Sequence, residues 1–134
     1  MRMIVTGILD LAGGVRVRHA RLSDRGRRRE HNEDAAGFRA EPATPPRSCL
    51  LTVADGVGGS PAGEVASRMA VETIARRFYE SGEPADVPAA LAAALQEANE
   101  AIVAAAAADP ARNGMATTCT CAVIGDGGIT VGHV

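Results

Sequence analysis

The sequence predicts an α+β fold, with strands first, two consecutive helices next, and strands again at the end. Short runs with the length and residue types of strands occur before residue 55 and after residue 116. Between them, two long stretches repeat apolar residues at three- and four-residue steps, as amphipathic helices do. Because these helices follow one another directly, the chain lacks the strict alternation of strand and helix that builds a parallel α/β sheet.

Composition limits the possible classes of protein. With 134 residues, the chain is long enough for one domain or for a piece of a larger one. Hydrophobic residues make up 46%, yet there are only two Phe, one Tyr and no Trp, so the core must consist mainly of aliphatic and small side chains. The formal net charge of −2 gives no general attraction to nucleic acid or to an anionic membrane. No run approaches the roughly 18 uncharged apolar residues of a membrane span.

The three cysteines, Cys49, Cys119 and Cys121, do not form a disulfide framework or a zinc site. Cys119 and Cys121 lie two residues apart in a strand-like run, so both side chains should point to one face. A structural zinc site needs about four ligands, and no second pair of His or Cys stands at a suitable spacing. We therefore expect buried free thiols and a protein of the reducing cytoplasm.

The segments before residue 55 are assigned in order. Residues 1–14 are an N-terminal extension or a first strand, and residues 15–22 alternate apolar and charged side chains, which predicts a half-buried strand. Residues 35–38 are a second, short strand. Prolines within residues 42–46 mark an exposed loop. Residues 50–54 are an apolar run that suits a buried strand and is too short for a helix.

The buried strand runs directly into Asp55, which is followed by glycines at positions 56, 58 and 59. Glycine permits positive φ and close approach of the backbone to a ligand. The pattern therefore places a carboxylate at the end of a buried strand, beside an accessible backbone. Taken alone, an ordinary Asp-Gly turn explains this stretch equally well.

Two helices are predicted next. The first has Pro61 at its first position and Glu64 in its first turn, and it ends near residues 81–82. The second is capped by Asp86 and ends at Asp109. Their apolar stripes are Val65, Ala66, Met69, Ala70, Thr73, Ile74 and Phe78 in the first helix, and Leu91, Ala94, Leu95, Ala98, Ile102 and Ala105 in the second.

Two strands follow the helices. Thr117 to Ile124 is rich in β-branched and small residues, and the Asp-Gly-Gly sequence at 126–128 predicts a hairpin turn into a last strand, Ile129–Val134. Because this strand pattern runs to the last residue, we expect the chain to be a fragment of a longer domain.

Four stretches resemble, in the same order, the metal-dependent type 2C family of protein serine/threonine phosphatases, most closely its bacterial branch. They are Ser23-Asp24-x-Gly26-x-x-Arg29-x-x-Asn32-Glu33-Asp34-Ala35, then Val53-Ala54-Asp55-Gly56-x-Gly58-Gly59 continuing into Ala62-Gly63-Glu64-Val65-Ala66-Ser67, then Gly114-Met115-Ala116-Thr117-Thr118, and finally Gly132-His133-Val134. The first two are long and specific, whereas the last two are weak by themselves. The resemblance implies a four-layer α-β-β-α sandwich, of which residues 15–134 would be an incomplete, N-terminal part.

The resemblance also implies a site for two, or in the complete domain three, Mg²⁺ or Mn²⁺ ions. Asp55 would bridge two ions and the carbonyl of Gly56 would ligate one. Glu33 would bind directly or through water, and Asp34 would support the site. Arg29 would bind the substrate phosphate, because its planar guanidinium suits that group. Such ions prefer oxygen ligands, and a pair of them can activate water and neutralise a phosphoryl group.

Two departures from the family pattern affect this expectation. Val57 stands where animal relatives often carry a histidine, although bacterial relatives commonly have an apolar residue there. The sequence also ends before the family's Gly-Asp-Ser-Arg motif and before two later aspartates that complete the metal site. We therefore expect the chain alone to bind metal weakly, to expose apolar sheet surface and to be inactive.

The resemblance implies phosphorylated proteins as substrates, made by a serine/threonine kinase, with no nucleic-acid or membrane partner. A non-catalytic, phosphatase-like binding or regulatory domain is the alternative that the sequence leaves open. A nucleotide-binding loop at residues 55–59 is disfavoured, because no Gly-Lys-Ser/Thr follows it.

Overall fold

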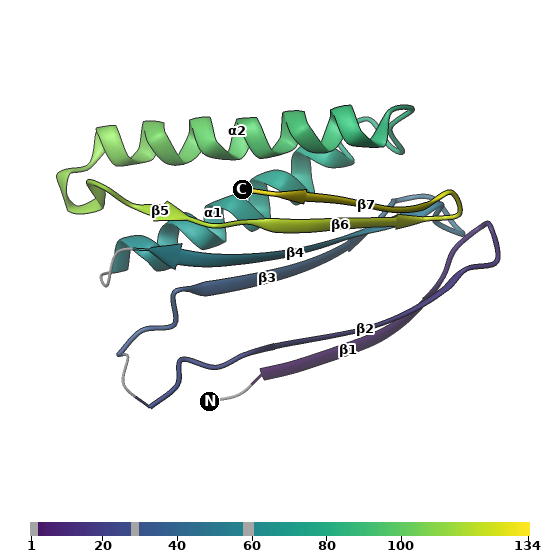
Figure 1. The fold of residues 1–134 in the computed structure, drawn as a ribbon, viewed down its shortest axis with the longest axis horizontal. Helices are drawn as coiled ribbons and strands as arrows, with labels where there is room; N and C mark the ends of the chain where they lie inside the picture. Colours follow the sequence, from purple (N-terminus) through teal and green to yellow (C-terminus); the bar gives the residue numbers. More distant parts are fainter. Residues whose placement is uncertain (1–2, 28–29, 58–60) are drawn as a thin grey trace.

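The computed structural model describes residues 3–27, 30–57 and 61–134. The elements are β1 (Met3–Asp10), β2 (Arg16–Ser23), β3 (Asp34–Ala40), β4 (Ser48–Val57), α1 (Pro61–Phe78), α2 (Val87–Ala108), the short 3₁₀ helix η1 (Pro110–Arg112), β5 (Ala116–Thr117), β6 (Thr120–Gly125) and β7 (Gly128–His133). The predicted α+β order of strands, two consecutive helices and strands is confirmed (Figure 1).

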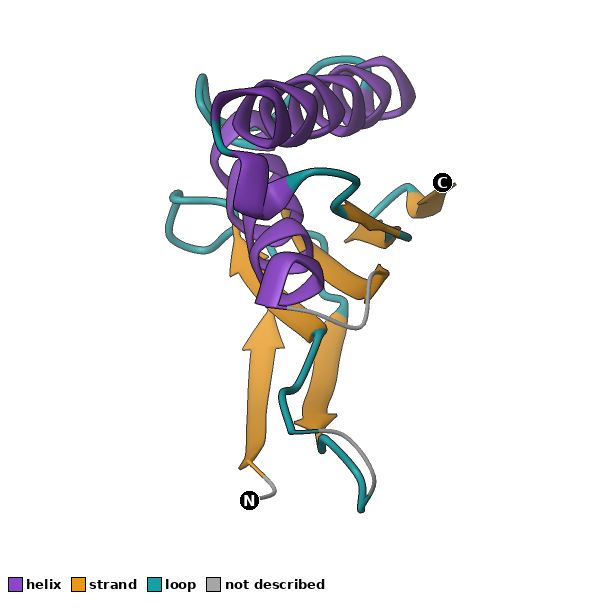
Figure 2. Ribbon diagram, turned by 90° about the vertical axis from the view of Figure 1, so that its left-hand side faces the viewer, coloured by secondary structure: helices purple, strands orange, loops and turns teal. Residues whose placement is uncertain are grey.

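The molecule is layered around one antiparallel sheet with the strand order β3-β4-β6-β7, in which β5 pairs with β4. Helix α1 packs on β3 and β4, and α2 packs on α1 and β7. The separate β1–β2 hairpin lies on the other side, away from the helices (Figures 1 and 2). This arrangement corresponds to a helical layer, a sheet and the beginning of a second sheet from the expected four-layer sandwich.

Strand β4 separates two apolar clusters, because its side chains alternate between the faces of the sheet. Leu50 and Ala54 join α1 and α2 in the larger cluster and are almost fully buried. On the opposite face, Cys49 and Leu51 join Phe38 and the turn end of the β1–β2 hairpin in a smaller cluster.

The helices agree closely with the prediction. The side chain of Asp86 accepts a hydrogen bond from the backbone nitrogen of Ala89 at 3.0 Å, so the predicted cap of α2 is confirmed. Helix α2 ends at Ala108, directly before Asp109. Its buried residues belong to the predicted stripe; they are Leu91, Ala94, Ala98 and Ile102. Helix α1 ends at Phe78, three residues before the predicted 81–82.

Residues 1–14, predicted to be an extension or a first strand, contain a strand; two later strands differ from the prediction. Residues 3–10 form β1, which pairs with β2 along its whole length. Strand β4 continues through Asp55 to Val57, so Asp55 lies within the strand and not after its end. The strand predicted over 117–124 is divided into β5 and β6, which nevertheless pair with β4 in one continuous register.

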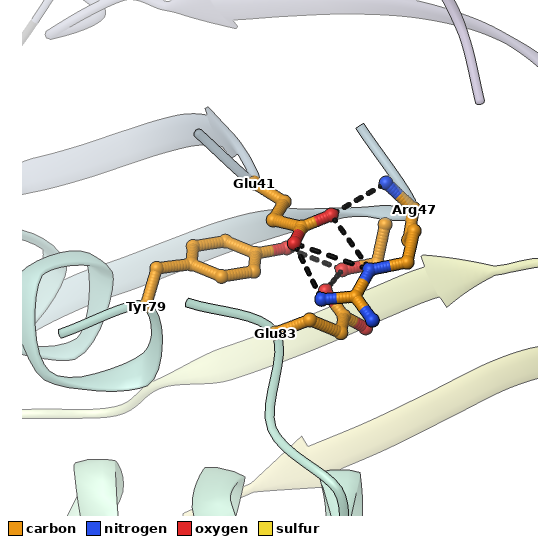
Figure 3. Close-up of polar contacts among 5 residues, drawn as sticks. Glu41, Arg47, Tyr79 and Glu83 are labelled. Atoms are coloured by element: carbon orange, nitrogen blue, oxygen red, sulfur yellow. Dashed lines mark hydrogen bonds and ion pairs between the residues drawn. The ribbon is translucent and has the colours of Figure 1, made fainter. Parts of the chain in front are cut away.

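A polar network joins the loop after β3 to the loop after α1 (Figure 3). The buried carboxylate of Glu41 accepts hydrogen bonds from the backbone nitrogen and Nη2 of Arg47, at 2.7 and 2.8 Å. Arg47 thereby lowers the pKa of the Glu41 carboxyl. Ser48 Oγ donates to Glu83 Oε2 at 2.5 Å, so the Tyr79 hydroxyl, 2.8 Å away, must donate to Ser48. These bonds fix the end of the sheet at which β4 begins.

Part of the sheet face that bears the hairpin is uncovered. Val53, Ile129 and Val131 all point to this face by their register, and they are 58%, 67% and 63% exposed. The predicted exposure of apolar sheet surface is therefore confirmed. None of the helices in the described ranges is long and apolar enough to cross a membrane.

Candidate functional site

The two aspartates of the predicted metal site lie side by side on adjacent strands. Asp34 is the first residue of β3, and it is the register partner of Asp55 in β4. Paired residues of antiparallel strands project to the same face, so both carboxylates lie on the face opposite α1. Both residues are exposed. The backbone nitrogen of Thr118 donates a hydrogen bond to the carbonyl of Asp55 at 3.0 Å and fixes β4 from its other edge.

Glu33 is placed by close packing among two glycines. The backbone nitrogen of Gly56 donates to the carbonyl of Glu33 at 3.1 Å, so the Gly56 carbonyl faces the same edge of β4. A Cβ atom on Gly56 would lie 2.2 Å from the carbonyl oxygen of Gly63, so only glycine fits there. A Cβ atom on Gly63 would lie 3.2 Å from the carboxylate carbon of Glu33. The buried Glu33 carboxylate therefore rests against the first turn of α1, where the helix dipole favours negative charge.

These residues surround a cavity of about 240 Å³ at the end of β4. It is lined by Asp24, Arg25, Gly26, Asn32, Glu33, Asp34 and Asp55. Asn32 Oδ1 accepts a hydrogen bond from the backbone nitrogen of Asp34, and Asn32 Nδ2 donates to Ser23 Oγ at 2.7 Å. Asp24 Oδ1 accepts from the backbone nitrogen of Gly26 at 2.8 Å and shapes the turn that closes the cavity. Four carboxylates and one guanidinium thus line one small space.

The donor set suits a hard divalent cation, because carboxylate oxygens are the ligands that Mg²⁺ and Mn²⁺ prefer. Within the ranges that the structure describes, however, no three His, Cys, Asp or Glu side chains are close enough together to hold a metal ion. A cation bound between the paired Asp34 and Asp55 would keep most of its water ligands. The described residues therefore fit part of a cation site.

The structure places the predicted site residues as follows. Glu33, Asp34, Asp55 and Gly56 come together at the end of the β3–β4 pair. Arg29, the predicted phosphate ligand, lies outside the described residues, as do the glycines at 58 and 59.

Two residues that the sequence did not single out for the site, Asp24 and Arg25, also line the cavity. Both belong to the first motif, and the Asp-x-Gly pattern at 24–26 could have indicated a turn that brings its own side chains back to the site. Arg25 Nη1 donates to the carbonyl of Glu30 at 3.2 Å, which holds the guanidinium at the rim.

Comparison with known proteins agrees with the motifs. The family model described as Protein phosphatase 2C matches residues 24–134. The chain is 35% identical over 115 residues to the serine/threonine phosphatase Stp of Listeria monocytogenes, covering 84% of this chain and 44% of that protein. It is 37% identical over 121 residues to the serine/threonine protein phosphatase PstP of Mycobacterium tuberculosis, covering 88% of this chain and 21% of that protein.

Solved structures show the same similarity. A crystal structure of the M. tuberculosis phosphatase PstP matches with a TM-score of 0.71 and 30% identity, over 99% of this chain and 46% of that chain. The catalytic domain of PstP in complex with two manganese ions matches with a TM-score of 0.69 and 31% identity, over 100% of this chain and 49% of that chain. The chain therefore spans about half, or less, of the length of these relatives.

Proposed function

Because the chain belongs to the protein phosphatase 2C family, as its motifs indicated, we propose that it is part of an enzyme that hydrolyses phosphoserine and phosphothreonine in proteins. The observation that carries the proposal is the pairing of Asp34 with Asp55 at the rim of a carboxylate-lined cavity. The sequence around both aspartates matches the family motifs, and the PstP catalytic domain that shares this fold contains manganese.

Each residue has a role in the proposed site. Asp55, Asp34, Glu33 and the carbonyl of Gly56 would hold Mn²⁺ or Mg²⁺, and Arg29 would bind the phosphate of the substrate. Two such ions, when bound, would activate water and neutralise the phosphoryl oxygens. Gly56 and Gly63 let α1 approach closely, which buries Glu33 against the first turn of α1.

We propose that residues 1–14 belong to the first strand of the domain and that residues 15–134 are an incomplete phosphatase domain. We also propose that this chain alone does not hydrolyse phosphorylated substrates. The relatives are about twice as long or longer, and the described carboxylates supply part of a cation site. The substrates would be proteins phosphorylated by a serine/threonine kinase. A cytoplasmic location suits the three buried cysteines, all of which are free thiols.

Manganese-dependent phosphate release from a phosphothreonine peptide tests this proposal. It is measured for the 134-residue chain and for the chain joined to the C-terminal half of the Listeria relative. We expect release only by the joined protein, and its loss in Asp55→Asn. Asp126→Asn is the matched control, because this exposed aspartate lies in the β6–β7 turn at the other end of the sheet.

Two results would contradict the proposal. Release by the 134-residue chain would show that it needs no further ligands. A joined protein that unfolds cooperatively but releases no phosphate would favour the second candidate, a non-catalytic binding domain. The exposed Val53, Ile129 and Val131 are the observation that favours this second candidate, because exposed apolar patches often mark interaction surfaces.

A further inference from the structure

Cys119 and Cys121 place two thiols side by side in the core, on the face of the sheet opposite the candidate cation site. Their Sγ atoms are 3.7 Å apart, and both side chains belong to the cluster formed with α1 and α2. The third cysteine, Cys49, is equally buried but belongs to the other cluster, beneath the β1–β2 hairpin. The chain therefore holds one thiol pair and one isolated thiol of similar burial.

The pair can close into a disulfide only if the chain bends between the two residues. Two residues of extended chain span about 6.6 Å between Cα atoms, near the upper limit of about 6.8 Å for a disulfide. Their Cβ atoms, which project to the same face, must also approach to about 3.5–4.5 Å, so bringing the sulfurs from 3.7 Å to bonding distance requires side-chain rotation and a bend in the chain. A bond closed near this limit is strained, and strained disulfides are readily reduced.

The surroundings favour one of the two thiols as the first to react. Cys119 and Cys121 share a hydrogen bond between their Sγ atoms, and Thr52, the register partner of Cys121 on β4, donates a second to Cys121. These bonds lower the pKa of the Cys121 thiol despite its burial. The hydrogen bond with Cys121 and, second, burial raise the pKa of Cys119. Thiolate is the form that attacks oxidants.

We propose that Cys119 and Cys121 form a reversible oxidation site, which closes to an intrastrand disulfide when it reacts with a peroxide. The Cys121 thiolate attacks one peroxide oxygen and becomes a sulfenic acid, while the other oxygen leaves and takes up a proton to form water. Cys119 then attacks the Cys121 sulfur, the S–S bond forms, and hydroxide leaves as a second water. Two thiols thus give two electrons and two protons to one hydrogen peroxide molecule, and a dithiol reductant reverses the reaction.

The disulfide lies close enough to Asp55 to affect the candidate cation site. Thr118, the neighbour of Cys119, holds the Asp55 carbonyl through its backbone nitrogen at 3.0 Å. Residues 118 and 119 also form the break between β5 and β6, where Cys119 and Val134 exchange two backbone hydrogen bonds of 2.9 Å. Closing the bond changes the strand at this break, and we expect cation affinity to fall several-fold. This consequence, unlike the disulfide itself, rests on the proposed function.

The test treats the folded 134-residue chain with hydrogen peroxide, removes the peroxide, unfolds the chain in denaturant with N-ethylmaleimide to block the remaining thiols, and reads the intact mass and a peptide map. We expect one blocked thiol, Cys49, and a Cys119–Cys121 disulfide that dithiothreitol removes. Cys49→Ser should form the same disulfide, whereas Cys119→Ser should not. The proposal is overturned if all three thiols are blocked after an exposure to peroxide that fully oxidises free glutathione in the same tube. A disulfide that includes Cys49 would also overturn it. The peptide map of the unsubstituted chain shows whether the Cys119–Cys121 disulfide forms, even if a variant folds poorly.

Manganese titration of the reduced and oxidised chain tests the coupling. Weaker manganese binding by the oxidised chain supports the proposal that Thr118 transmits the effect of the disulfide to Asp55. Equal manganese binding by the two forms overturns that part of the proposal. If the reduced chain binds no manganese while the disulfide still forms, the cation site of the proposed function fails and the oxidation site stands.

Discussion

Replacing Gly56 by alanine introduces a methyl group where β4, α1 and the segment before β3 meet. The new Cβ atom would lie 2.2 Å from the Gly63 carbonyl oxygen and 2.7 Å from the Glu33 carbonyl oxygen. Real Cβ contacts are almost never shorter than 3.0 Å, and both neighbours are backbone atoms that cannot rotate away. The first turn of α1 must therefore move by roughly 1 Å, which opens the packing around Glu33.

Overpacking of this kind costs about 1–3 kcal/mol, and contacts with backbone on two sides put Gly56→Ala near the upper end, at about 3 kcal/mol. At a slope of about 2 kcal/mol per molar urea, the unfolding midpoint should fall by about 1.5 M. Urea unfolding followed by far-ultraviolet circular dichroism measures this directly. Gly127→Ala is the matched control, because a Cβ atom there meets nothing within 4 Å and its φ is not positive. Equal midpoints for the two variants would refute the close approach of α1 to β4 and the placement of Glu33 that depends on it.

Three further predictions concern stability. Arg47 lowers the pKa of Glu41, so its stabilisation is present above the ordinary value of 4.5 and is lost as the pH falls below it. Arg47→Met should lower the stability at pH 7 and flatten this acid-side loss in thermal melts. Asp86→Ala removes the cap of α2 and should cost about 1 kcal/mol by urea unfolding, and Asp86→Asn should retain most of the stability. Leu50→Ala should cost about 2–5 kcal/mol, whereas Val131→Thr on the exposed face should change stability by less than about 0.5 kcal/mol and reduce binding of the dye ANS. A normal urea midpoint for Leu50→Ala, or unchanged dye binding by Val131→Thr, would contradict the assignment of the two sheet faces.

The helices were predictable because their signals are local. The cap at Asp86 and the apolar stripe of α2 are separated by only a few residues, and both are found where the sequence places them. Strand β1 was harder to recognise, because residues 3–10 lack the alternation of apolar and polar side chains that is typical of a half-buried strand. Their pairing with β2 over the whole length of the strand is visible only in the structure. The division of the strand predicted over 117–124 into β5 and β6 depends on how its residues pair with β4. No local sequence pattern describes this pairing.

The candidate site was predicted mainly from motifs, and its geometry depends on register. Glu33 and Asp34 come from one motif and Asp55 from another, and only the pairing of β3 with β4 shows that Asp34 lies opposite Asp55. The need for glycine at position 56 depends on how closely α1 approaches β4. The network around Glu41 and Tyr79 could not be predicted, because it joins loops far apart in the sequence.

Manganese binding by the 134-residue chain, followed through the loss of the electron paramagnetic resonance signal of free Mn²⁺, tests most directly whether the cavity beside Asp55 is a cation site. We expect weak binding, with a Kd of about 1 mM, because the described carboxylates supply only part of a ligand set. Asp55→Asn should weaken this binding at least about tenfold, a difference of about 1.4 kcal/mol, and Asp126→Asn should bind like the parent chain. Equal binding by the parent and Asp55→Asn would contradict the assignment of Asp55 as a metal ligand.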